Sequence, residues 1–131
     1  MVGISLLIFT YNEASEIKEF LSHIAKYVDE ICLVDSYSED DTVKIAKNFH
    51  AKVYYAPKLG YQDPLRQICL NLCRYNWIIH VDLDERLTLK LRQDLRYLIE
   101  YAARNGYVAI SIPFLELVDG KLCSYFGTCL L

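Results

Sequence analysis

The 131-residue sequence contains no apolar run approaching the ~18–20 residues of a membrane-spanning helix. The longest candidate, residues 4–9, has the length of a buried strand. The N-terminus lacks the basic segment that opens a signal peptide. The five cysteines are odd in number and include no Cys-x-x-Cys pair, which argues against a secreted disulfide framework and leaves only a Cys123–Cys129 pairing open. We therefore expect a cytoplasmic protein with at most peripheral membrane association.

A surplus of positive charge is also absent. Lys and Arg together number 14 against 17 Asp and Glu, which gives a net charge of −3. This balance argues against a protein that coats nucleic acid, and it leaves room for a small basic pocket for one phosphorylated ligand. Repeats, low-complexity segments and interdomain linkers are absent as well. With 53% hydrophobic residues, residues 1–131 are expected to form a single domain.

Short apolar runs of strand length alternate along the chain with segments of helical periodicity. We expect strands at residues 3–9, 30–35, 51–56, 77–81 and 107–113. We expect helices at residues 15–27, 38–48, 62–75 and 88–104, with Ser15 and Ser38 as candidate caps. Strand–helix alternation predicts a doubly wound α/β fold, in which helices cover both faces of a mostly parallel sheet. Asp119-Gly120 predicts a C-terminal β-hairpin between residues 115–118 and 121–126.

Polar clusters follow three of the expected strands, at residues 10–13, 35–38 and 82–85. In a parallel α/β sheet, ligands bind beyond the carboxyl ends of the strands, so these clusters should meet at one edge. Carboxylates gathered there repel one another unless a cation or a donor-rich ligand lies among them. An oxygen-rich site of this kind suits Mg²⁺ or Mn²⁺.

Asp82 and Asp84 form the most specific candidate for such a site. Alternate residues of an extended segment face the same side, so both carboxylates could point at one ligand. A metal ion held there could bridge two phosphate oxygens and stabilise a leaving diphosphate. Taken alone this pattern is weak, because short acidic triplets usually form a solvated strand end.

The context of these aspartates resembles the family-2 glycosyltransferases. Residues 77–86, WIIHVDLDER, resemble the WVLxLDADER-type motif of that family. Residues 8–13, IFTYNE, and residues 34–42, VDSYSEDDT, match two further motifs in order and spacing, with Asp41 where glycine is more usual. Gly60-Tyr61 and Arg66-Gln67 resemble its GF…QRN segment. The resemblance is strongest to enzymes that extend bacterial or archaeal surface glycans and lipopolysaccharide cores.

This resemblance implies a GT-A fold, which is Rossmann-like, and a nucleotide-diphospho-sugar donor linked to UDP or GDP. The loop formed by Thr10, Tyr11, Asn12 and Glu13 would line the nucleoside pocket. Asp35 would accept hydrogen bonds from the base. Residues 1–105 would then form the donor-binding part of the domain.

The resemblance also assigns roles around the acidic triplet and implies Mn²⁺ or Mg²⁺ as cofactor. Asp82 would contact the ribose or the sugar, and Asp84 would ligate the metal ion. Glu85 would support the metal site, and Arg86 would orient the acidic loop by pairing with Glu85. Arg66 would lie near the phosphates or the edge of the base.

Several of these residues also have a simpler structural interpretation. Glu13 could place a charge at the start of the first helix, where the helix dipole favours carboxylates. Asp35 could simply form a turn. Asp40 and Asp41 are more typical of helix N-terminal charges than of ligands, and His80 is more typical of core packing than of a metal site.

The acceptor side of a glycosyltransferase is poorly represented. An inverting enzyme needs a general base for the acceptor hydroxyl, and in the family this carboxylate usually lies further downstream. The residues after Asp84 are largely taken up by one helix, one strand and a hairpin. Glu116 is the candidate base, because Asp119 is expected in the turn. Residues 106–131 would thus form a short remnant of the acceptor part.

Two hypotheses remain. The first is a metal-dependent, inverting glycosyltransferase with an unknown glycan, lipid-linked or protein acceptor, whose site is completed by a second subunit or a membrane-bound substrate. The second is a nucleotide-sugar-binding module without turnover, or a truncated remnant of a longer enzyme. Nucleotidyl transfer normally brings a Gly-rich, basic phosphate loop near the first strand, and residues 10–16 show none. A homodimer through residues 125–126 and 129–131 would cover an apolar end.

Overall fold

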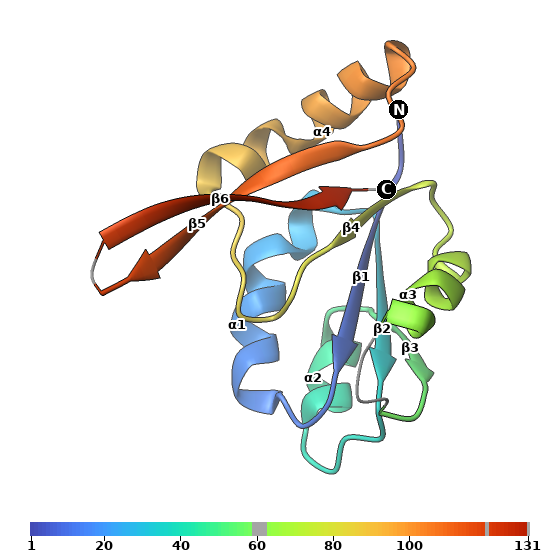
Figure 1. The fold of residues 1–131 in the computed structure, drawn as a ribbon. Coiled ribbons are helices and arrows are strands. Elements are labelled where there is room, and N and C mark those ends of the chain that lie inside the picture. The colour runs from blue at the N-terminus through green and yellow to red at the C-terminus, as the bar shows by residue number, and fades with distance from the viewer. Residues whose placement is uncertain (59–62, 120, 131) are drawn as a thin grey trace.

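The computed structural model describes residues 1–58, 63–119 and 121–130. Its described elements form a four-stranded parallel sheet with flanking helices and a separate two-stranded antiparallel sheet (Figure 1). In chain order they are β1 (Ile4–Thr10), α1 (Ala14–Ile24), the 3₁₀ turn η1 (Ala25–Tyr27), β2 (Glu30–Asp35), α2 (Thr42–Asn48), β3 (Lys52–Tyr55), α3 (Asp63–Cys69), the 3₁₀ turn η2 (Leu70–Leu72), β4 (Trp77–His80), α4 (Leu89–Arg104), β5 (Ile110–Val118) and β6 (Lys121–Leu130).

The parallel sheet has the strand order β3-β2-β1-β4, so β1 is an inner strand. Thr10 at the end of β1 pairs in register with Asp35 at the end of β2, and Leu7 of β1 pairs with His80 at the end of β4. Because all four strands run in the same direction, the loops that follow β1, β2 and β4 meet at one edge of the sheet. This edge carries the three polar clusters of the sequence.

Strand β1 is buried on both faces, which explains its nearly continuous apolar sequence. On one face, Ile4, Leu6 and Ile8 belong to a core shared with α1, α2 and α4. On the other face, Leu7 packs in a smaller cluster with residues of α3 and the segment after it. Figure 1 shows α1 and α3 on opposite sides of the sheet. The prediction of a doubly wound α/β fold is therefore confirmed.

The starts of the first two helices differ from the expected ones. Helix α1 begins at Ala14, so Ser15 lies within the helix and does not cap it. Helix α2 begins at Thr42, and the Ser38 hydroxyl does not cap it, because it accepts a 2.8 Å hydrogen bond from the Asn12 amide and donates one of 2.6 Å to Asp35. Helix α4 begins at Leu89, one residue after the predicted start, and the Thr88 side chain caps it by accepting a hydrogen bond from the Leu91 amide.

Helix α4 is fixed to the start of the sheet by one arginine. Arg96 donates a 2.7 Å hydrogen bond to the carbonyl of Val2 and contacts both carboxylate oxygens of Asp29 at 3.0 Å. Asp29 in turn accepts a hydrogen bond from the amide of Ile4. No helix in the described part of the chain has the length and apolar character needed to cross a membrane.

The strand expected at residues 107–113 is found shifted, as β5 at Ile110–Val118, and it does not join the parallel sheet. Strand β5 pairs antiparallel with β6 outside the main sheet, with a register irregularity between Ser111 and Pro113. Antiparallel pairing needs only a tight turn, and Asp119 has the left-handed φ of 48° that such a turn uses.

Cys123 and Cys129 lie near opposite ends of β6, about 20 Å apart at ~3.3 Å per residue, which excludes a disulfide between them. The side chains on which the dimer expectation rests lie outside the described ones.

Candidate functional site

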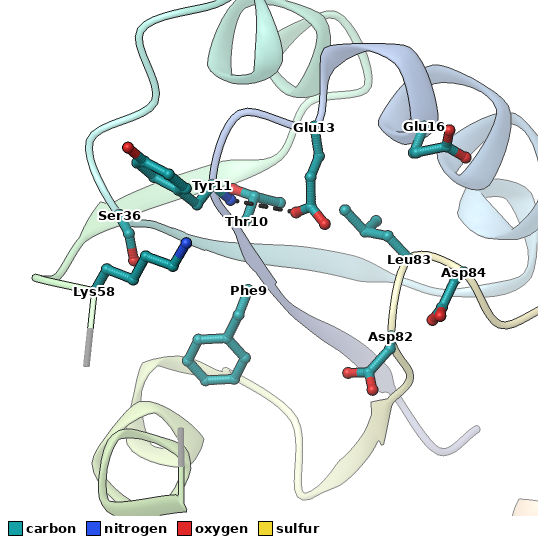
Figure 2. Close-up of a pocket in the computed structure, with 10 residues that line it drawn as sticks. All are labelled: Phe9, Thr10, Tyr11, Glu13, Glu16, Ser36, Lys58, Asp82, Leu83 and Asp84. Atoms are coloured by element: carbon teal, nitrogen blue, oxygen red, sulfur yellow. Dashed lines mark hydrogen bonds between the residues drawn. The ribbon is translucent and has the colours of Figure 1, made fainter. Parts of the chain in front are cut away.

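A pocket of about 450 Å³ opens at the carboxyl edge of the parallel sheet (Figure 2). Its walls come from the ends of β1, β2 and β4 and from the segment that follows β3. The lining residues are Phe9, Thr10, Tyr11, Glu13, Glu16, Ser36, Lys58, Asp82, Leu83 and Asp84. Of the predicted site residues, the pocket thus brings together Thr10, Tyr11, Glu13, Asp82 and Asp84.

Asn12 connects the two loops that form the upper wall. Its backbone has φ of 50°, a left-handed conformation that asparagine tolerates better than most residues. Its amide donates to the Ser38 hydroxyl at 2.8 Å, and its side-chain carbonyl accepts from the Glu39 amide at 2.7 Å. Asn12 is not among the lining residues, so in this structure it fixes the β1–α1 loop against the β2–α2 loop.

Asp35 lies beneath the pocket and is fully buried. Its carboxylate accepts hydrogen bonds from the Thr10 hydroxyl at 2.7 Å, the Ser38 amide at 2.7 Å and the Ser38 hydroxyl at 2.6 Å. The next residue, Ser36, lines the pocket in its place. The predicted contact of Asp35 with a base stays a prediction, and the hydrogen bonds seen here give it a structural role.

Glu13 extends into the pocket between Tyr11 and the acidic turn (Figure 2). Its carboxylate accepts a 3.2 Å hydrogen bond from the Tyr11 amide. Burial raises the pKa of Glu13, and the nearby carboxylates of Asp82 and Asp84 raise it further, whereas the Tyr11 amide and Lys58 lower it. The pKa of Glu13 is thus raised first by burial, and repulsion from the neighbouring carboxylates adds to this effect.

The acidic triplet forms a turn after β4. The Glu85 carboxylate accepts a 2.8 Å hydrogen bond from the Asp82 amide, and the Glu85 amide donates to the Asp82 carbonyl at 3.0 Å. Leu83 is buried between two exposed aspartates. Residues 83 and 84 are in a turn, so the extended geometry expected for the triplet is wrong. Both Asp82 and Asp84 nevertheless line the pocket.

Glu85 and Arg86 stabilise this turn without lining the pocket. Burial raises the pKa of Glu85, as do the charges of Asp82 and Asp84. The Arg86 guanidinium donates to the carbonyl of Leu83 and, at 3.0 Å, to the carbonyl of Glu85, and it lies 5.4 Å from the centre of the Phe20 ring. Arg86 therefore holds the turn through backbone carbonyls, whereas the expected contact was with the Glu85 carboxylate.

Arg66 is not among the described residues that line the pocket. The charge of Arg66, in α3, opposes the rise in the pKa of Glu85, and it adds to the burial that lowers the pKa of His80. Glu116 is in β5, opposite Cys123, and its side chain lies outside the described ones. Gly60 and Tyr61, which carried part of the family resemblance, also lie outside the described residues.

The sequence analysis missed Lys58, Ser36, Phe9 and Glu16 as pocket residues. Lys58 had a usable signal, because it follows β3 at the same sheet edge as the three polar clusters. Ser36 directly follows β2 in one of these clusters. Phe9 and Glu16 belong to patterns that also fit a buried strand and an exposed helix face, so their position could not be read from the sequence.

The pocket residues fit a divalent cation that has an open coordination sphere. In the described part of the chain, no group of three or more His, Cys, Asp or Glu side chains is placed to hold a metal ion by itself. The exposed carboxylates of Asp82 and Asp84 could supply one or two oxygen ligands. Mg²⁺ and Mn²⁺ accept such a site, because water and substrate phosphates complete their coordination.

Comparison with known sequences identifies relatives over most of the chain. The sequence model described as glycosyl transferase family 2 matches residues 5–120. A protein of Rickettsia felis named as an uncharacterized glycosyltransferase is 37% identical over 115 residues, which are 88% of this chain and 40% of that protein. The chain thus spans about two-fifths of the length of this curated relative.

Solved structures share the fold. Glucosyl-3-phosphoglycerate synthase from Mycobacterium tuberculosis, in complex with Mn²⁺, UDP and glucosyl-3-phosphoglycerate, has a TM-score of 0.53 and 25% identity, over 63% of this chain and 34% of that one. A mannosyltransferase from Pyrobaculum calidifontis, in complex with GDP-Man and Mn²⁺, has a TM-score of 0.60 over 76% of this chain and 32% of that one. Its 22% identity shows likeness of fold alone.

Proposed function

The chain belongs to glycosyl transferase family 2, and from this premise we propose that its pocket binds a nucleotide-diphospho-sugar with a divalent metal ion and serves transfer of the sugar to an acceptor. One observation carries the proposal. Two exposed carboxylates, Asp82 and Asp84, line one side of a pocket whose other side is formed by the loops after β1 and β2. Carboxylates in this arrangement need a cation or a donor-rich ligand.

The roles we propose for the residues are those that the resemblance to family 2 implies. Asp84 holds the metal ion, and Asp82 contacts the ribose or the sugar. Tyr11 and Ser36 line the side that receives the nucleoside. Mn²⁺ or Mg²⁺, when bound, supplies Lewis-acid stabilisation of the leaving diphosphate. A solved structure of the same fold in complex with UDP and Mn²⁺ supports a donor of this class.

We assign residues 1–105 to donor binding and residues 106–131 to the acceptor side, with Glu116 as the general base of an inverting reaction. The acceptor would be a glycan, a lipid-linked substrate or a protein. The alternative is a module that binds nucleotide sugars without turnover. It is favoured by the small number of acidic residues in the β5 and β6 sequence that could act as a general base.

A release assay tests this proposal. The full chain is incubated with UDP-glucose or GDP-mannose and Mn²⁺, with water as the acceptor of the sugar, and the UDP or GDP freed by this hydrolysis is separated and measured. We expect release from one donor, reduced at least ~10-fold in Asp84→Asn and unchanged in Asp94→Asn, a matched change on α4 outside the pocket. Donor binding without release would favour the module. Neither binding nor release by the folded protein would contradict both.

A further inference from the structure

We propose that Lys58 binds the donor diphosphate from the side of the pocket opposite Asp82 and Asp84, and that it makes the pocket selective for nucleoside diphosphates over nucleosides. This inference rests on the proposed function of the same pocket. Lys58 lies outside the four sequence motifs but lines the pocket.

The backbone before Lys58 is fixed to the sheet. The Ala56 amide donates a 3.1 Å hydrogen bond to the carbonyl of Asp35, and Pro57 follows with a restricted φ. The position from which the Lys58 side chain leaves is thus set by the ends of β2 and β3. Figure 2 shows the side chain crossing the pocket wall with its amine toward Tyr11.

Tyr11 holds the amine of Lys58 at the pocket. The Lys58 Nζ lies 4.1 Å from the centre of the Tyr11 ring, within the range of a cation–π contact. The N–H bonds that do not face the ring are available to a ligand. Among the interactions of the described residues, Lys58 makes no ion pair and no hydrogen bond.

Apart from Lys58, the charged residues among the described pocket lining are all acidic. Glu13, Glu16, Asp82 and Asp84 are acidic, and Lys58 is the cationic residue among the described lining residues. A metal ion at the acidic turn neutralises a diphosphate from one side only. Lysine on the other wall supplies a point charge with N–H donors, which suits the remaining phosphate oxygens.

Phosphate recognition and a purely structural role predict different ligand dependences. If Lys58 binds the diphosphate, its removal weakens the binding of UDP or GDP but not that of uridine or guanosine, which carry no phosphate. If Lys58 only positions Tyr11, its removal weakens nucleoside and diphosphate binding by the same factor. The ratio of the two affinities therefore separates the roles.

The test uses the full chain with Mn²⁺. Calorimetry measures UDP and GDP, and an NMR titration measures the matching nucleoside, for wild type, Lys58→Met and Lys58→Arg. Lys47→Met, on the exposed face of α2, is the matched control. We expect Lys58→Met to lose about 10-fold or more in diphosphate affinity, with nucleoside affinity unchanged, and Lys58→Arg to stay within about threefold of wild type.

Three results would overturn the inference. If wild type binds the diphosphate and Lys58→Met binds it with the same affinity, the proposed role of Lys58 is refuted and the proposed function is not affected. An equal loss for diphosphate and nucleoside assigns Lys58 to positioning Tyr11. Failure of folded wild-type protein to bind either diphosphate refutes both the inference and the proposed function.

Discussion

The Thr10 hydroxyl donates a 2.7 Å hydrogen bond to the carboxylate of Asp35, and the same two residues are paired in register at the carboxyl ends of β1 and β2. Both side chains are buried, so the bond is made away from water. Ser38 completes the coordination of the carboxylate through its amide and hydroxyl. Beneath the pocket, a buried carboxylate thus joins two strands and the β2–α2 loop.

Replacing Thr10 by Val tests this hydrogen bond, because the change removes a donor while keeping the shape of the side chain. A buried carboxylate that loses one donor should cost about 1–3 kcal/mol in the free energy of unfolding. Thr10→Ser retains the hydroxyl and should recover most of this loss. Urea denaturation of the three proteins measures the difference. Equal stability of the Val and wild-type proteins would show that the bond contributes nothing.

Arg86 is expected to matter for ligand binding through the shape of the acidic turn. Arg86→Met keeps a long apolar side chain against Phe20 but removes the donors to the carbonyls of Leu83 and Glu85. Because the turn presents both aspartates, we expect Mn²⁺-dependent nucleotide affinity to fall about 3–10-fold, in line with the usual effect of groups that orient metal ligands.

The matched control for Arg86 is Arg104→Met at the exposed end of α4. Calorimetric titration should give this control the affinity of wild type. If Arg86→Met is folded and binds metal and nucleotide as tightly as wild type, the turn does not depend on these carbonyl contacts.

Glu30, at the opposite end of the sheet, predicts a pH dependence of stability. Burial alone would raise its pKa, but hydrogen bonds from Lys52, Ser5 and the Arg74 amide outweigh burial and lower the pKa of Glu30 to about 2. The unfolded chain has the ordinary value of 4.5. The carboxylate therefore stabilises the fold above pH ~4.5, and this contribution is lost as the pH falls from there toward ~2.

Glu30→Gln removes this contribution. At pH 7 we expect the variant to lose about 1.5–3 kcal/mol in the free energy of unfolding, since its partners include a charged amine and a buried hydroxyl. Between pH 7 and pH 3 the stability of the variant should fall less than that of wild type. Urea denaturation at both pH values, with the exposed Glu19→Gln as control, measures this. Parallel pH profiles for wild type and Glu30→Gln would refute the assignment.

Much of the fold could be predicted because β1 and β2 are covered on both faces and read as apolar runs ending in polar clusters. The predicted bounds of the second strand match β2, Glu30–Asp35. The start of α2 could not be predicted, because residues 36–42 contain several possible caps. Tertiary hydrogen bonds choose among them, and Ser38 is engaged by Asp35.

The site was predictable in outline but not in detail. The rule that ligands bind beyond the carboxyl ends of parallel strands placed Thr10, Tyr11, Glu13, Asp82 and Asp84 at one edge, and the structure brings all five to one pocket. The sequence could not tell whether the carboxylate of Asp35 faces a ligand or lies beneath the pocket. That depends on donors from distant segments, which no local pattern encodes.

Isothermal titration of UDP and GDP tests the central claim most directly. Each nucleotide is titrated with and without Mn²⁺ into wild type, Asp84→Asn and the control Asp94→Asn. We predict that one nucleotide binds wild type and the control in the presence of Mn²⁺, and at least ~10-fold more weakly without Mn²⁺ or in Asp84→Asn. The account is contradicted if folded wild type binds neither nucleotide with Mn²⁺ present, or if binding is indifferent to both Mn²⁺ and the Asp84 carboxylate.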